Sequence, residues 1–237
     1  MRSNMYLLAG GRGSDTESLL RAAFAETGKE HPSIAYIGTA NGEDRAFMRY
    51  LEETLKPAGA GEVHLVRLLG FEKGSEEAHK ILKGSDLIFI SGGEVEDGMN
   101  GLSKDIRVLL RELYELGKVF VSISAGTIML GIAWPHWDDE DNHPEDAWLF
   151  DCLGFASTIF DTHCEWEDWV ELRKAVELSP EGFTGYGIPT GGMVLIRPDG
   201  TLQPTIPLDA YRSENGEAVY IGKFDGTDYK LSSGASD

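Results

Sequence analysis

The sequence has few cysteines, few basic residues and no long hydrophobic run. Cys152 and Cys164 are the two cysteines among 237 residues, which excludes a disulfide framework and a cysteine-based zinc pattern. Lys and Arg total 21 against 40 for Asp and Glu, so the formal net charge is −19. Because phosphate groups would be repelled, this balance argues against nucleic acids and anionic membranes as partners.

The first apolar run, in MRSNMYLLAGGRG, is too short for a signal peptide or a membrane-spanning helix. With so few cysteines, the composition favours a reducing compartment, and we expect a cytoplasmic protein. Apolar residues make up 41% of the chain, which is enough for a substantial core.

Short apolar runs alternate with helical patterns through the first 130 residues. Buried strands are expected at 5–10, 33–40, 62–68, 86–93 and 118–124. The segments between them carry apolar residues at helical spacing. This alternation predicts a doubly wound, three-layer α/β fold, with a mostly parallel sheet covered by helices on both faces.

The pattern is looser after residue 131. Residues 134–148 read as a polar, aromatic-containing loop. Further elements are expected as a strand in 153–163, a helix in 167–178, two strands and a hairpin turn at 198–200 within 182–202, and a last strand at 217–225. No repeat or linker composition divides the chain, so we predict a single domain over residues 1–237.

The stretch VSISAGTIML, residues 121–130, places small residues between a strand and a helix. A nucleophile elbow needs small residues two positions before and after its nucleophile, and Ser122 and Gly126 meet that need around Ser124. The N–H of Ala125 would then face a developing oxyanion. The alternative is a turn whose small residues serve close packing.

Two further segments are expected at the same edge of the sheet. The glycine pair in SGGEVEDG, at the end of the preceding strand, lets a backbone amide approach a ligand, and Gly93 is the candidate donor. A serine nucleophile needs a base. His163 ends the apolar run STIFDTH downstream of the serine, where a strand can deliver it to this edge.

These pieces occur in a recognisable order: YIGTA, IFISGGEVEDGMNGL, SISAGTIMLG, FDTH and GYGIPTGGMVLIRPDG. The order resembles the aspartyl dipeptidase and cyanophycinase family of serine peptidases, over roughly residues 5–203. That family shares the fold of class I glutamine amidotransferase domains. The resemblance implies a serine hydrolase that cleaves a peptide or isopeptide bond in a short peptide.

The resemblance also implies the roles of single residues. Ser124 is the expected nucleophile and His163 the general base, with the amides of Gly93 and Ala125 as the oxyanion hole. The family's late acid aligns with Thr190, so the expected orienting acid is Asp139, about fifteen residues after the serine.

Two residues are expected to bind substrate. Glu94 follows the glycine pair, where relatives often have Asn or Asp. Arg173 is the nearby arginine that would read an acidic first residue, as in the aspartyl dipeptidases. Because acidic residues surround Arg173, a free amino terminus or a basic side chain is an open alternative. Glu167 stands where the cyanophycinase branch has an arginine, which argues against cyanophycin as substrate.

Other functions are less favoured. The loop PHWDDEDNHPED matches no established spacing of metal ligands, so we expect no metal. The segment AGGRGSD lacks the third glycine of a dinucleotide-binding loop, so we expect no cofactor. A non-catalytic relative that binds a small ligand or partner is the main alternative, because the late acid is lost and Ser122 replaces the elbow's first glycine. A small peptide is the expected partner, with a homodimer as a possible assembly.

Overall fold

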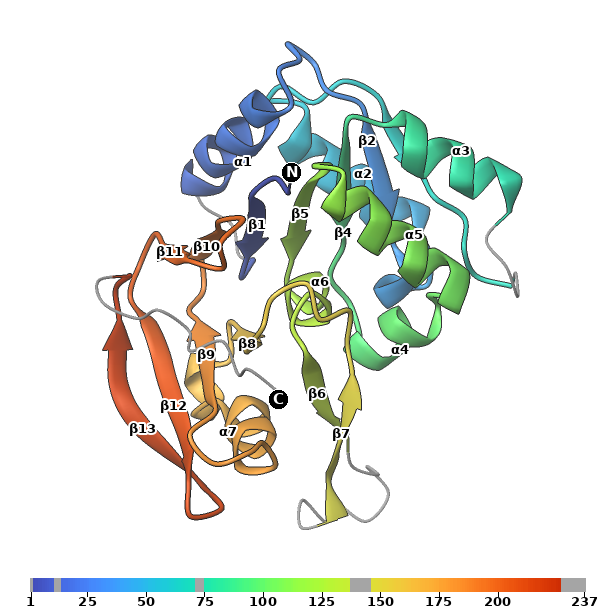
Figure 1. Ribbon diagram of the computed structural model, residues 1–237. Helices are drawn as coiled ribbons and strands as arrows, with labels where there is room; N and C mark the ends of the chain where they lie inside the picture. The colour runs from blue at the N-terminus through green and yellow to red at the C-terminus, as the bar shows by residue number, and fades with distance from the viewer. Residues whose placement is uncertain (1, 11–13, 71–74, 137–145, 227–237) are drawn as a thin grey trace.

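The computed structural model describes residues 2–10, 14–70, 75–136 and 146–226 (Figure 1). Within these ranges the strands form a seven-stranded sheet, a four-stranded sheet and a two-stranded hairpin. The described helices include none that is long and apolar enough to cross a membrane.

The large sheet carries the parallel core that the sequence predicts. In spatial order its described strands are β11 (Leu202–Pro204), β10 (Met193–Ile196), β1 (Met5–Leu8), β5 (Val119–Ile123), β4 (Leu87–Ile90), β2 (Ile34–Ile37) and β3 (Val63–Leu65). The five strands from β1 to β3 run parallel, whereas β10 and β11 are antiparallel additions at the β1 edge. The carboxyl ends of β4 and β5 therefore lie side by side, as the site prediction requires.

Helices cover both faces of this sheet, which confirms the three-layer fold. The described helices are α1 (Ser14–Glu26), α2 (Arg45–Leu55), α3 (Glu76–Gly84), α4 (Val95–Asn100), α5 (Lys104–Glu115), α6 (Ala125–Met129), α7 (Val170–Glu177) and the short 3-10 turns η1 (Thr39–Asn41) and η3 (Glu165–Glu167). Alternate residues of β1 divide between the faces, because successive strand side chains point to opposite sides. Tyr6 and Leu8 pack in a cluster with α1 and α2, while Met5 and Leu7 belong to the cluster that includes α3 and α5.

A second sheet holds the later strands, and this division was not predicted. Its order is β13 (Glu217–Phe224), β12 (Leu208–Glu214), β9 (Thr184–Ile188) and β8 (Ile159–Thr162). The two strands expected within 182–202 are present as β9 and β10, but they belong to different sheets, and the hairpin turn at 198–200 joins β10 to β11. Apolar runs predict strands but not their partners, and β12 was missed altogether. In Figure 1 this sheet lies below the large sheet, with α7 packed beside it.

The expected loop at 134–148 is partly wrong. β6 (Ala133–His136) and β7 (Trp148–Asp151) pair as an antiparallel hairpin, with Trp134 opposite Phe150. The sequence pattern did not predict these strands, because β6 contains Pro135 and proline is depleted from strands. The residues between the two strands, 137–145, are outside the described ranges.

Candidate active site

Ser124 is held in the backbone geometry of an elbow. It directly follows β5 and precedes the first residue of α6, with φ 52° and ψ −127°. A non-glycine residue in this region is strained, and the surrounding structure must hold it there. The Ser124 N–H donates to the Leu8 carbonyl at 3.0 Å, so β1 fixes the turn from the neighbouring strand.

The small residues on either side of Ser124 serve close packing as well. A methyl group at Gly126 would lie 2.3 Å from the carbonyl oxygen of Ile90 at the end of β4. The Ser122 hydroxyl is fully buried and lies 2.9 Å from the Thr127 hydroxyl, which in turn donates to the Leu8 carbonyl at 2.8 Å. The packing turn and the elbow are thus the same structure, and the buried Ser122 is no candidate nucleophile.

His163 reaches the serine from the second sheet. It follows β8 with φ 48°, and its N–H donates to the Ile188 carbonyl of β9 at 3.0 Å. Its ring atom Nε2 lies 2.8 Å from Ser124 Oγ. The two residues that the sequence paired are therefore within hydrogen-bond distance, although they come from different sheets.

The two expected oxyanion donors lie next to the serine. Gly93 has φ 142°, and a side chain there would lie 1.9 Å from the Ala40 carbonyl oxygen, so only glycine fits. Ala125 is the first residue of α6. Within the described part of the chain, neither N–H has a hydrogen-bond acceptor. Both residues line a cavity together with Ser124.

The orienting acid is not decided by the described residues. Asp139, the expected acid, lies outside them. Glu165 offers a different carboxylate, since its Oε1 accepts from the N–H of Thr190 at 3.1 Å. Burial opposes ionisation of Glu165, but hydrogen bonds from Thr190 and the charge of His163 hold its pKa below the usual range. The sequence analysis assigns no role to Glu165, because only the 3-10 turn η3 brings its carboxylate to Thr190.

Two cavities meet at Ser124 and His163. The first, of about 330 Å³, is lined by Gly93, Glu94, Val95, Glu96, Ser124, Ala125, Ile128, Trp134, Pro135, His136, Phe150, Asp161, Thr162, His163, Cys164 and Glu171, and we call it the acidic cavity. The second, of about 890 Å³, includes Phe47, Tyr50 and Leu51 of α2, and we call it the α2 cavity. Glu94 is thus beside the serine, as expected.

Arg173 is not brought to this site. Its guanidinium Nη1 pairs with Asp168 Oδ2 at 2.5 Å, and it lines a separate cavity with Trp169 and Tyr211. Arg173 lies on α7 one turn beyond Trp169, whereas Glu171 of the same helix faces the acidic cavity. The described structure therefore does not bring Arg173 to the cavities at Ser124, and its role in reading substrate stays a prediction.

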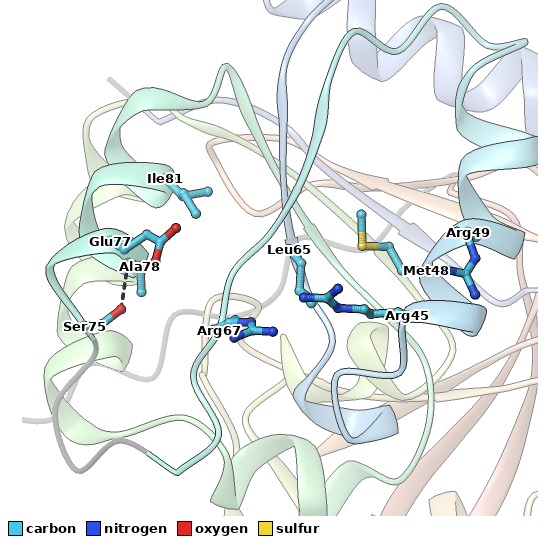
Figure 2. Close-up of a pocket in the computed structure, with 9 residues that line it drawn as sticks. All are labelled: Arg45, Met48, Arg49, Leu65, Arg67, Ser75, Glu77, Ala78 and Ile81. Atoms are coloured by element: carbon cyan, nitrogen blue, oxygen red, sulfur yellow. Dashed lines mark hydrogen bonds between the residues drawn. The ribbon is translucent and has the colours of Figure 1, made fainter.

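Another cavity gathers arginines away from the serine. It has a volume of about 440 Å³ and lies near the end of β3, with Arg45 and Arg49 of α2 and Arg67 among its lining residues. Figure 2 shows the side chains of Arg45 and Arg67 pointing toward one another beside Leu65. Neither Ser124 nor His163 lines it. The basic groups of this region are thus separated from the serine.

Asp161 is an acidic residue that the sequence reasoning missed. It is 1% exposed, and burial raises its pKa to about 7, with the charge of Glu171 adding to the rise. A signal was present in STIFDTH, because residues two apart in a strand share a face, which places Asp161 on the face of His163.

Asp161, Cys164 and Glu171 each offer one ligand atom for a metal ion, and these atoms lie within 4.8 Å of one another. A thiol binds metal as the thiolate. Burial and the charges of Asp161 and Glu171 hold the pKa of the Cys164 thiol well above its usual range. A metal ion would therefore have to displace the thiol proton, which makes Cys164 the weakest donor of the three.

Comparison with protein-family models decides the family. The model of peptidase family S51 matches residues 5–203. This chain belongs to peptidase family S51. The resemblance seen in the sequence is confirmed, and the protein is a peptidase of a serine peptidase family. A search of curated proteins finds no match.

Solved structures share the S51 fold at low sequence identity. The chain is similar to a peptidase from an acI-B1 Actinobacterium, with a TM-score of 0.74, 14% identity and 96% of each chain covered. It is also similar to a putative peptidase E protein from Listeria monocytogenes EGD-e, with a TM-score of 0.60 and 17% identity. That match covers 86% of this chain and 98% of the other.

The packing of the elbow predicts the effect of a methyl group at Gly126. Gly126→Ala would place Cβ 2.3 Å from one backbone oxygen and 2.7 Å from another, so we expect the free energy of unfolding to fall by about 2 kcal/mol or more. Gly84→Ala is the control, since nothing lies within 4 Å of its Cβ. Urea denaturation of both variants measures the difference, and equal stabilities would contradict the close approach.

Because burial raises the pKa of Asp161, we expect the stability of the protein to depend on pH. In the folded protein the pKa of Asp161 is about 7, whereas the pKa of a free aspartate is 3.8. The stability that protonated Asp161 contributes is therefore fully present below the pKa of the free group. It is lost as pH rises through the pKa of the folded protein. Asn does not titrate, so Asp161→Asn should gain stability relative to the wild type across this window. Denaturation at a series of pH values measures it, and a constant difference would contradict the burial of this acid.

Proposed function

We propose that this S51 peptidase hydrolyses an amide bond of a short peptide through an acyl-enzyme on Ser124. The observation that carries the proposal is the 2.8 Å separation of Ser124 Oγ and His163 Nε2 at a strained elbow. A serine becomes nucleophilic when an adjacent base accepts its proton, and this distance is within reach for that transfer.

The first step forms the bond between Ser124 Oγ and the carbonyl carbon of the substrate. His163 Nε2 takes the hydroxyl proton, and the N–H groups of Gly93 and Ala125 donate to the oxyanion. Collapse of this intermediate breaks the C–N bond, and His163 delivers the proton to the departing amine. Water then attacks the ester with His163 as base, and the proton returns to Ser124 as the acid product leaves.

The surroundings favour a short substrate. Trp134, Pro135 and His136 of β6 and Phe150 of β7 line the acidic cavity, so the hairpin restricts access from that side. A thiolate mechanism is disfavoured, because the elbow holds a serine and the nearby Cys164 has a pKa well above its usual range.

Covalent labelling tests the nucleophile. We expect a fluorophosphonate probe to add once to the wild type, with intact mass showing one adduct, and to add nothing to Ser124→Ala. Removal of a nucleophile costs about 10⁶ in turnover, so loss of labelling should be complete on the time scale of the assay. Ser122→Ala is the matched control and should label normally, because its hydroxyl is buried. Labelling that survives in Ser124→Ala would refute the proposal.

Two carboxylates compete for orienting His163. Asp139 is the candidate from the sequence. Glu165 is the candidate among the described residues, because the charge of His163 helps to lower the pKa of Glu165 and the buried Glu165 Oε2 has no other hydrogen-bond partner there. We expect Glu165→Gln to slow fluorophosphonate labelling by a factor on the order of 10⁴, as loss of an orienting acid does in other serine peptidases. Asp139→Asn should then label at nearly the wild-type rate.

A spectroscopic signature separates orientation from a structural role. A downfield imidazole N–H proton resonance in the wild type should disappear in Glu165→Gln while the unfolding midpoint stays close to that of the wild type. The reverse pattern, with slow labelling in Asp139→Asn alone, would assign the role to Asp139.

A further inference from the structure

The charged side chains that line the acidic cavity beside Ser124 are mainly carboxylates. Its carboxylates are Glu94, Glu96, Asp161 and Glu171, and no lysine or arginine is among the described residues that line it. Glu96 Oε2 lies 2.5 Å from His136 Nδ1. None of the other three carboxylates forms an ion pair with a basic side chain among the described residues. A cavity of this composition repels a substrate carboxylate and attracts a cation.

Asp161 is the residue that points to an occupant. Its Oδ1 accepts from the N–H of Thr162 at 2.6 Å, but Oδ2 is buried and has no hydrogen-bond partner in the described structure. A buried oxygen left without a donor costs free energy, and most such groups in proteins are satisfied by a partner, water or ligand. A ligand that donates a charged hydrogen bond would satisfy Asp161 Oδ2.

Glu171 brings a second carboxylate to the same place. It reaches the cavity from α7, and one of its oxygens lies within 4.8 Å of a candidate ligand atom on both Asp161 and Cys164. Burial and the nearby charges of Glu167 and Glu94 raise the pKa of Glu171. Repulsion between these carboxylates therefore opposes their ionisation, and a bound cation would relieve it.

We propose that the acidic cavity binds the ammonium or guanidinium group of a lysine or arginine side chain in the substrate, next to the bond that is cleaved. The inference rests on the proposed function, because it places the cation relative to Ser124. A volume of about 330 Å³ accommodates such a side chain. Several carboxylates also suit the multiple N–H donors of these groups.

Two other occupants fit the structure less well. An acidic side chain would need an arginine at the cavity, but Arg173 is paired with Asp168 elsewhere, and the arginines of Figure 2 line a separate cavity. A metal ion would have to displace the proton of the Cys164 thiol, whose pKa is well above its usual range, whereas an ammonium group binds with the thiol protonated.

Protection of Ser124 from the fluorophosphonate probe tests the cation site. Nα-acetyl-lysine methylamide is compared with the neutral Nα-acetyl-norleucine methylamide, which has a side chain of similar length. We expect the lysine compound to slow labelling at a concentration lower by about tenfold or more, as charged hydrogen bonds typically give. Asp161→Asn and Glu171→Gln should each lose this preference. Glu112→Gln, at an exposed residue of α5, should keep it.

Each other result would overturn the inference. Equal protection by the lysine and norleucine compounds would show that the charge is not read. Protection by alanine methylamide, with its free amino group, as strong as that by the acetylated lysine would assign the cavity to an α-ammonium group. Protection that needs added Zn²⁺ or Mn²⁺ and is lost with a chelator would assign it to a metal ion.

A second measurement separates this inference from the proposed function. Calorimetric titration of Ser124→Ala with the same two acetylated compounds reads binding without any covalent step. If the wild type is not labelled at all, the proposed nucleophile fails, while preferential binding of the lysine compound in calorimetry would still support the cation site. Normal labelling with equal binding of both compounds would refute the cation site alone.

Discussion

The close approach of the elbow to the end of β4 is the constraint on which the site depends. Gly126 lies so near the Ile90 carbonyl that no side chain fits, and Ser124, two residues earlier, has a positive φ that serine rarely adopts. The strained turn directs Oγ out of the sheet edge. The question posed by a run of small residues after a buried strand thus has a single answer, because the same packing that excludes larger side chains presents the hydroxyl.

The base comes from a different sheet, so the site also depends on how the two sheets are joined. The segment between β9 and β10 crosses from one sheet to the other, and Gly191 N–H donates to the Gly10 carbonyl at 2.8 Å along the way. The neighbouring Ile188 carbonyl accepts from His163. Charge is distributed unevenly around this junction: carboxylates line one side of Ser124, aromatic and aliphatic residues of α2 line the other, and arginines gather elsewhere.

Local patterns in the sequence were sufficient for the parallel sheet, the elbow and the pairing of Ser124 with His163, because each depends on short-range periodicity or on steric limits at single positions. The second sheet and the β6–β7 hairpin were not predicted, because the partners of a strand are determined by long-range packing. The position of Arg173 away from the serine could not be foreseen for a similar reason. Sequence distance from His163 could not show which face of α7 meets the cavity, and that face carries Glu171.

The central claim is that Ser124 becomes covalently acylated during turnover. Rapid acid quenching of the wild type mixed with a lysine p-nitrophenyl ester, followed by intact mass and peptide mapping, tests it most directly. The account predicts a burst of p-nitrophenol of about one equivalent and a lysyl adduct located on Ser124. Steady product release with neither burst nor adduct, while hydrolysis still requires Ser124, would favour direct attack by water and contradict the account.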